Sequence, residues 1–163
     1  MDALQLLEAE HDDIEALLQK LEKAKATRAR HLFQELADQL DLVERLEQTY
    51  LYPPLRADPD ARELALEHFA EHDLVDRLVA ELKTLKPDDQ DWHPKVKVLK
   101  EELDRHIRAE ETELFPRLRL IWDADKLRHT YRKMEQLKAE WKTEKALGIL
   151  GSPGAEAPVT PDS

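Results

Sequence analysis

The chain has 163 residues, with 25 basic and 36 acidic side chains, so its net charge is −11 at pH 7. Apolar residues make up 41% and charged residues 37%, which is typical of a soluble, helix-rich protein and too apolar for a disordered one. The acidic balance argues against nucleic acid or an anionic membrane as a partner, because both need a basic surface. The chain lacks cysteine, which excludes disulfides, iron–sulfur clusters and thiolate zinc sites.

The first residues, Met1-Asp2-Ala3-Leu4, lack the basic segment that opens a signal peptide. Apolar runs in the chain are too short to cross a membrane. We therefore expect a cytoplasmic protein with no membrane partner.

Apolar residues recur at helical spacing, and all three glycines lie at or beyond Gly148. The chain also lacks the alternation and hairpin turns of strands. The spacing predicts a first helix over residues 2–25. A second helix is predicted to follow Thr27 and to end before Pro53-Pro54.

Three further helices follow in the same pattern. Asp58-Pro59 has the form of a cap and a first-turn proline, and predicts the start of the third helix. The fourth is predicted to start near Pro94. The fifth is predicted to start near Asp123 and to stop at Gly148.

The chain contains an internal repeat. Residues 10–18 (EHDDIEALL) resemble residues 71–79 (EHDLVDRLV) at an offset of 61, and residues 43–55 resemble residues 106–118 at an offset of 63. Two helical hairpins of one design predict a four-helix bundle with approximate twofold symmetry.

The predicted fold is therefore all-α: an antiparallel up-down four-helix bundle, built from two helical hairpins, over residues 1–122. A fifth helix, residues 123–147, is expected to pack outside the bundle. Residues 148–163 are rich in Gly, Pro, Ala and Ser and are expected to form a disordered tail.

Polar residues interrupt the apolar stripes of these helices. A bundle core favours Leu or Val at such positions, and an unpaired buried polar group costs about 1–3 kcal/mol. The six residues are His11, Glu47, His68, His72, His106 and Glu110.

Antiparallel helices can be aligned by reflecting residue numbers about each loop, since each residue rises by about 1.5 Å. Reflection of His11 about a turn near residue 26.5 gives about residue 42, close to Glu47. The same reflection about the other two loops gives the remaining polar residues the same depth in the bundle. All six are therefore predicted to form one site.

The composition of this predicted site favours metal binding. The pairs His68/His72 and His106/Glu110 have i,i+4 spacing, which directs two side chains to one side of a helix. Imidazole and carboxylate ligands without sulfur suit Fe, Mn or Zn. Two carboxylates among separate sets of imidazoles suit two metal ions better than one.

The pattern of these six residues, with an aromatic-Pro pair after each second helix (Tyr52-Pro53 and Phe115-Pro116), resembles the hemerythrin-like, or HHE cation-binding, family. The resemblance covers residues 1 to about 122. It implies a non-haem, oxo- or hydroxo-bridged pair of iron ions that binds O2 or H2O2. One iron would take His68, His72 and His106, the other would take His11, and Glu47 and Glu110 would bridge them.

The chain departs from this pattern at Val43, where both the repeat and the family predict histidine. Glu44, next along the helix, resembles an extra carboxylate ligand of iron-sensing relatives. Tyr50, one turn after Glu47, offers a phenolate to ferric iron. Water in place of the missing ligand, or a mononuclear site, remains open, as do a solvated Glu44 and a core Tyr50.

Reversible O2 carriage needs a firmly held second iron, so we expect a sensor or a peroxide-reactive redox protein rather than a carrier. Peroxidase-like, catalase-like or oxidase activity is left open. The alternative is a helical bundle with a degenerate, mononuclear or zinc site in a structural or interaction role.

Two enzyme motifs in the sequence compete with this expectation. The segment His68-Phe69-Ala70-Glu71-His72 matches H-x-x-E-H, a zinc peptidase motif, but Glu71 is predicted to lie off the stripe. A ferritin-type Glu-x-x-His occurs once, at Glu8 and His11, where a pair is expected.

Overall fold

A computed structural model describes residues 1–149 of the chain, and every regular element in that range is helical. The bundle consists of four long helices: α1 (Ala3–Lys23), α2 (Ala26–Leu46), α4 (Arg62–Lys83) and α5 (Trp92–Ala109). The predicted fold class, an antiparallel bundle with an additional C-terminal helix, is confirmed.

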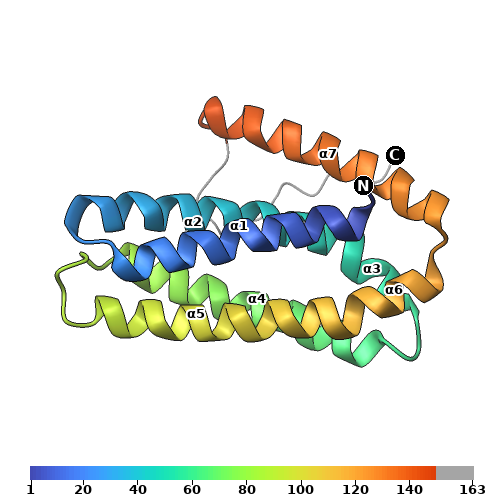
Figure 1. Cartoon of the computed structure of the whole chain (residues 1–163), viewed down its shortest axis with the longest axis horizontal. Helices are drawn as coiled ribbons and strands as arrows, with labels where there is room; N and C mark the ends of the chain where they lie inside the picture. Colours follow the sequence, from blue (N-terminus) through green and yellow to red (C-terminus); the bar gives the residue numbers. More distant parts are fainter. Residues whose placement is uncertain (150–163) are drawn as a thin grey trace.

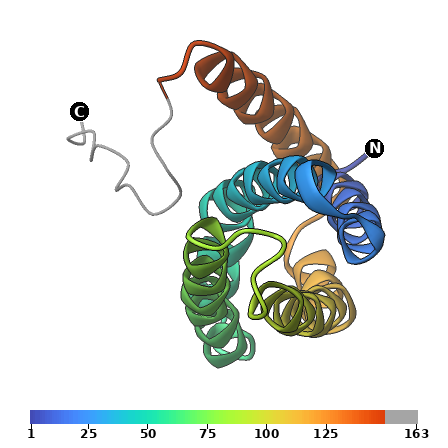
Figure 2. The same ribbon diagram turned by 90° about the vertical axis from the view of Figure 1, so that its left-hand side faces the viewer.

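The four helices form two hairpins. α1 packs against α2 and α4 packs against α5, and the hairpins join along α1 and α5. Neighbouring helices run in opposite directions along the long axis of the molecule (Figure 1). Figure 2 shows the bundle end-on, with a further helix outside it.

The second helix of each hairpin continues past its proline, although the first of the two was predicted to end there. α2 passes through a π-helical turn, η1 (Glu47–Leu51), into α3 (Tyr52–Ala57). α5 passes through η2 (Glu110–Leu114) into α6 (Phe115–Ile121). The predicted end before Pro53 was wrong, because each proline lies in the first turn after the π-helical segment, where a missing N–H is tolerated.

The start of the third predicted helix also differs. α4 begins at Arg62, four residues after Asp58, and a turn connects it to α3. The Asp58 carboxylate accepts hydrogen bonds from the Arg117 guanidinium of α6, one of them at 3.0 Å. Asp58 therefore links the two hairpins at this end of the bundle instead of capping α4.

The apolar core is divided into two clusters by the polar layer. One cluster fills the end where α1 joins α2 and includes Leu18, Leu36 and Trp92. The other fills the end formed by α3 and α6 and includes Leu4, Leu46 and Leu114. The polar residues thus lie in the middle of the bundle, covered from both ends.

α7 (Ala124–Ala146) is the predicted fifth helix and packs on α1 and α2 outside the bundle (Figures 1 and 2). The Asp123 side chain accepts a hydrogen bond from the Lys126 N–H and caps its first turn. Gly148 follows its end with a φ of 70°, a conformation that favours glycine. The tail predicted over residues 148–163 lies almost wholly outside the described residues.

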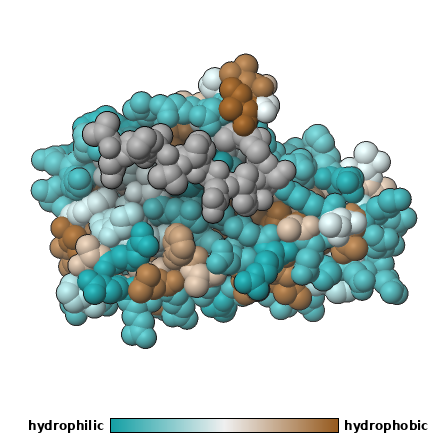
Figure 3. Space-filling view, turned by 180° about the vertical axis from the view of Figure 1, so that it is seen from behind, coloured by the Kyte–Doolittle hydropathy of each residue, from teal (hydrophilic) through white to brown (hydrophobic). Residues whose placement is uncertain are grey.

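The surface seen in Figure 3 is mainly hydrophilic, and its hydrophobic side chains form separate patches. Within residues 1–149 we find no helix with the length and apolar character needed to cross a membrane.

Candidate metal centre

The six polar residues predicted to share a layer do lie together. They come from α1, η1, α4, α5 and η2, and each is at most 4% exposed. The buried set is His11, Glu47, His68, His72, His106 and Glu110.

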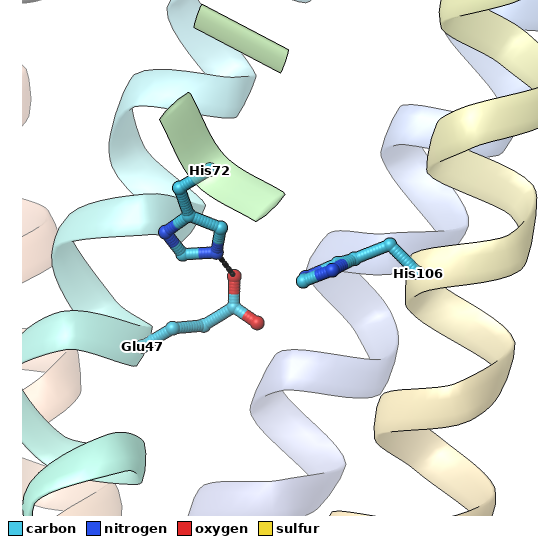
Figure 4. A group of neighbouring side chains, drawn as sticks. All are labelled: Glu47, His72 and His106. Carbon is cyan, nitrogen blue, oxygen red and sulfur yellow. Dashed lines mark ion pairs between the residues drawn. The ribbon is translucent and has the colours of Figure 1, made fainter. Parts of the chain in front are cut away.

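Glu47 connects the two hairpins at this layer. Its Oε1 lies 3.4 Å from His72 Nε2 and its Oε2 lies 3.7 Å from His11 Nε2. Figure 4 shows the Glu47 carboxylate directed towards His72, with the His106 ring facing it from α5. Donor atoms of Glu47, His72 and His106 lie within 4.8 Å of one another. One cation can contact all three.

Glu110 has the equivalent position in the second hairpin. Its Oε1 lies 3.4 Å from His11 Nε2, and its Oε2 lies 3.2 Å from His106 Nε2 and 3.9 Å from His68 Nδ1. Both carboxylates therefore contact imidazoles from both hairpins, which is the arrangement that bridging ligands require.

Outer hydrogen bonds orient three of the imidazoles. His11 Nδ1 donates to Glu111 at 2.9 Å, and His106 Nδ1 donates to Glu71 at 2.5 Å. These bonds leave the Nε2 atoms of both rings facing the layer, and a carboxylate partner raises the basicity of a metal-binding imidazole. The Gln48 amide nitrogen donates to His72 Nδ1 at 3.0 Å, which orients the third ring through the opposite direction of hydrogen bonding.

Five atoms of the layer are buried and have no hydrogen-bond partner: His11 Nε2, Glu47 Oε2, His68 Nδ1, His106 Nε2 and Glu110 Oε1. Unpaired buried polar atoms are rare in folded proteins and costly. All five converge on one layer, and each offers a lone pair to a cation once its imidazole is neutral. The residues therefore fit a bound metal cation.

Protonation takes the place of a cation in the metal-free site. Burial alone would lower the pKa of His11, but the neighbouring carboxylates of Glu110 and Glu111 outweigh burial and raise it. Burial likewise opposes the rise for His106, but the neighbouring carboxylates of Glu110 and Glu71 raise its pKa to about 10. Burial lowers the pKa of His68, and repulsion from His106 lowers it further.

Metal uptake is expected to strengthen as the pH rises. A cation binds neutral imidazole, so uptake must displace the protons that the raised pKa values of His11 and His106 hold near neutrality. Affinity should rise by about tenfold per pH unit for each proton displaced. Competition titrations between about pH 6 and pH 8 measure this slope, and a flat profile would contradict it.

The predicted ligand Tyr50 does not join the layer. It packs half-buried with the cluster that contacts α7, and the negative charge of Glu140 lies near its hydroxyl. Tyr52 joins the layer instead: its hydroxyl donates to Glu110 Oε2 at 2.8 Å and lies 3.0 Å from His72 Nε2. The wider turn of η1 places residue 52, rather than residue 50, on the face that carries Glu47.

Replacement of Tyr52 by Phe should destabilise the metal-free protein by about 2 kcal/mol, because it removes a hydrogen bond to a buried carboxylate. Urea unfolding measures the change. The matched control Tyr50→Phe should have little effect, since Tyr50 is half-buried and outside the layer. Equal effects of the two substitutions would show that the Tyr52 hydroxyl is not specially placed.

A cavity of about 20 Å³ adjoins the layer on the side of Val43. Its apolar wall includes Val43, Leu40 and Leu103, and its polar wall includes His11 and Glu47. A cavity of this size holds one water-sized molecule. The missing imidazole has therefore left a small space beside the donor atoms.

Glu44 also lines this cavity, and the Asp76 carboxylate of α4 lies near its carboxyl group. Burial and the Asp76 carboxylate raise the pKa of Glu44 to about 10, so it is protonated at neutral pH. Its Oε1 has no hydrogen-bond partner. Glu44 thus lies near the layer as a neutral acid in the metal-free protein.

The H-x-x-E-H motif does not form a peptidase site. Glu71 accepts from His106 Nδ1 and from the Arg105 guanidinium, at 2.5 and 3.1 Å. Burial would raise the pKa of Glu71, but the His106 contact lowers it to about 2. Glu71 is therefore an anionic partner of an imidazole and is not placed to act as a general base beside His72.

Sequence reasoning missed Tyr52, Glu71, Glu111 and Gln48. Gln48, Glu71 and Glu111 each adjoin a stripe position, so a regular helical pattern places them towards solvent. Tyr52 lies beyond the last predicted stripe position of its helix. The internal repeat held the signal, because Gln48 corresponds to Glu111 and Tyr52 to Phe115 at an offset of 63. Phe115 stacks on the His11 ring with centroids 5.9 Å apart, while Tyr52 packs on His72 at 5.3 Å.

The comparisons with known proteins agree with this geometry. The model of the hemerythrin HHE cation binding domain matches residues 2–118. A crystal structure of a hemerythrin HHE cation binding domain-containing protein from Mycobacterium kansasii superposes with a TM-score of 0.81, covering 91% of this chain and 92% of that one at 23% identity. A comparison with curated proteins finds no match. The chain belongs to the hemerythrin HHE cation-binding domain family.

Proposed function

We propose that this protein is a non-haem diiron protein that binds O2 or H2O2 in its core, and that it acts as a sensor or a peroxide-reactive redox protein rather than as an O2 carrier. The convergence of five unpaired buried donor atoms on one layer supports the metal site. Imidazole and carboxylate donors without sulfur suit iron.

The residues divide into two sets in this proposal. His68, His72 and His106 would hold one iron, and His11 would hold the second. Glu47 and Glu110, which contact imidazoles of both hairpins, would be shared by the two ions. A bound iron pair would supply two electrons to O2 or peroxide. The chain supplies orientation, through Glu71 and Glu111, and exclusion of water by the two apolar clusters.

Val43 is the main reason to propose a sensor or redox protein. It is 3% exposed and lies on the cavity wall, where it leaves the second iron with fewer imidazoles than the first. The cavity beside it has room for one water-sized molecule, so only a very small ligand could enter it. The Tyr52 hydroxyl donates a hydrogen bond to Glu110 at the other side of the layer.

The test is oxidation of the ferrous protein followed by optical spectroscopy. Mixing with H2O2, and separately with O2, should produce the absorption of ferric iron, and removal of O2 should not restore the ferrous spectrum. Full restoration would indicate carriage and overturn the proposal. Loss of all iron, or retention of one zinc ion per chain, would favour the structural alternative.

Replacement of Val43 by His should strengthen retention of the second iron by at least about tenfold, because it restores an imidazole beside the cavity. Iron content after graded chelation measures the effect. Val98→His is the matched control, since Val98 is 50% exposed on α5 and adds an imidazole away from the layer. Equal retention in both variants would show that residue 43 does not face the metal.

A further inference from the structure

Glu10 is a buried carboxylate that the metal layer does not use. It is 3% exposed, although it precedes His11 in α1. Its two oxygens pair with the Lys138 ammonium of α7 and the Gln39 amide of α2. A carboxylate at this depth needs such partners to remain charged.

The internal repeat gives Glu10 a counterpart with a known contact. At an offset of 61, Glu10 corresponds to Glu71, which accepts a hydrogen bond from His106 Nδ1. At an offset of 63, the position that corresponds to His106 is Val43. Glu10 therefore stands where a carboxylate orients a ligand in the other hairpin, but the imidazole is absent.

The cation beside each carboxylate also differs. Glu71 is paired with Arg105, which lies on the same helix as His106. The position equivalent to Arg105 in α2 is Leu42, which is 1% exposed and carries no charge. The first hairpin thus lacks its own counter-ion, and α7 supplies one as Lys138.

We propose that Glu10 occupies the position of the ligand-orienting carboxylate in the first hairpin but orients no ligand in this chain, and that it fastens α7 to the bundle through Lys138 instead. The two carboxylates related by the internal repeat, Glu71 and Glu10, then differ in function. Glu71 increases the affinity for the cation, while Glu10 stabilises the packing of α7 on the bundle. The first half of this inference rests on the proposed function, because it treats His106 as a ligand.

The first experiment compares the isosteric variants Glu10→Gln and Glu71→Gln. Glu71→Gln should weaken cation affinity by about 10- to 100-fold, the usual effect of removing an outer partner. Glu10→Gln should leave affinity unchanged. It should instead accelerate hydrogen exchange of the α7 amides by about tenfold, since it removes a charge-assisted hydrogen bond.

Lys138→Met provides the matched variant on the other helix. It keeps an unbranched apolar side chain, removes the ammonium, and should reproduce the exchange effect of Glu10→Gln. A loss of cation affinity in Glu10→Gln as large as in Glu71→Gln would overturn the inference. Unchanged α7 exchange in both Glu10→Gln and Lys138→Met would overturn it as well.

A double-mutant cycle tests the link to Val43. In Val43→His the new imidazole finds Glu10 as its partner, so the gain in iron retention should fall by about tenfold or more in Val43→His/Glu10→Gln. An undiminished gain would contradict the inference. A wild-type protein that binds no cation would defeat the proposed function alone, because α7 exchange is measured on the metal-free protein.

Discussion

Removal of the bound cations is expected to lower the midpoint of thermal unfolding by about 10 °C. A ligand present at about a thousand times its dissociation constant stabilises the folded state by about 4 kcal/mol, and each kcal/mol moves the midpoint of a domain of this size by about 2–4 °C. The physical source is the set of five unpaired donor atoms, which lose their partner when the cation leaves. Differential scanning calorimetry with and without chelator measures the shift.

The control for chelation is a variant that cannot bind the cation. In Glu110→Gln, addition of chelator should leave the midpoint unchanged. A chelator effect of equal size in wild type and variant would indicate that the cation acts elsewhere on the chain. An unchanged midpoint in wild type would show that the layer is stable without an ion.

Glu110→Gln is expected to have the largest effect of any single substitution in the layer. Glu110 is 0% exposed and contacts imidazoles from α1, α4 and α5. Its pKa lies well below the usual value: burial opposes this, but hydrogen bonds from the neighbouring side chains outweigh burial. A neutral amide leaves the cationic imidazoles His11 and His106 without their shared anion.

We expect this substitution to abolish metal retention and to destabilise the metal-free protein by about 3 kcal/mol, the usual cost of removing one partner of a buried ion pair. Metal analysis and urea unfolding measure the two effects. Glu113→Gln, an exposed position in the same π-helical turn, should change neither. Full metal content in Glu110→Gln would contradict a bridging role for this carboxylate.

The metal layer itself could be predicted from the sequence because it depends on simple geometry. His11 and Glu47 are polar residues on apolar stripes, and the rise per residue and the loop positions fix their depth in an antiparallel hairpin. The same calculation places His72 and His106 beside each other, and their rings have centroids 5.3 Å apart.

Residues past the π-helical turns could not be placed in this way. A wider turn shifts the helical register by one residue, which moves Tyr52 to the layer and Tyr50 towards α7. The same turns continue the helices beyond Pro53 and Pro116. A proline in these two positions therefore does not end its helix, although that was predicted for Pro53. Regular periodicity contains no signal for such a shift.

The outer partners were missed for a different reason. Glu71 and Glu111 border the apolar stripes, and charged residues at such positions usually face solvent. Only the contacts across the bundle show that each carboxylate accepts from the Nδ1 atom of a histidine on another helix. Glu10 belongs to the same class, and its partner lies on α7, more than a hundred residues away in the chain.

The most direct test of the central claim is a titration of the metal-free protein with ferrous ion under exclusion of air, with bound iron counted per chain. We expect two bound ions per chain, because His11, Glu47 and Glu110 lie together with the other three histidines of the layer, His68, His72 and His106. We also expect Glu110→Gln to bind neither ion. Binding of no iron by the wild-type protein, or equal binding by wild type and Glu110→Gln, would contradict the account.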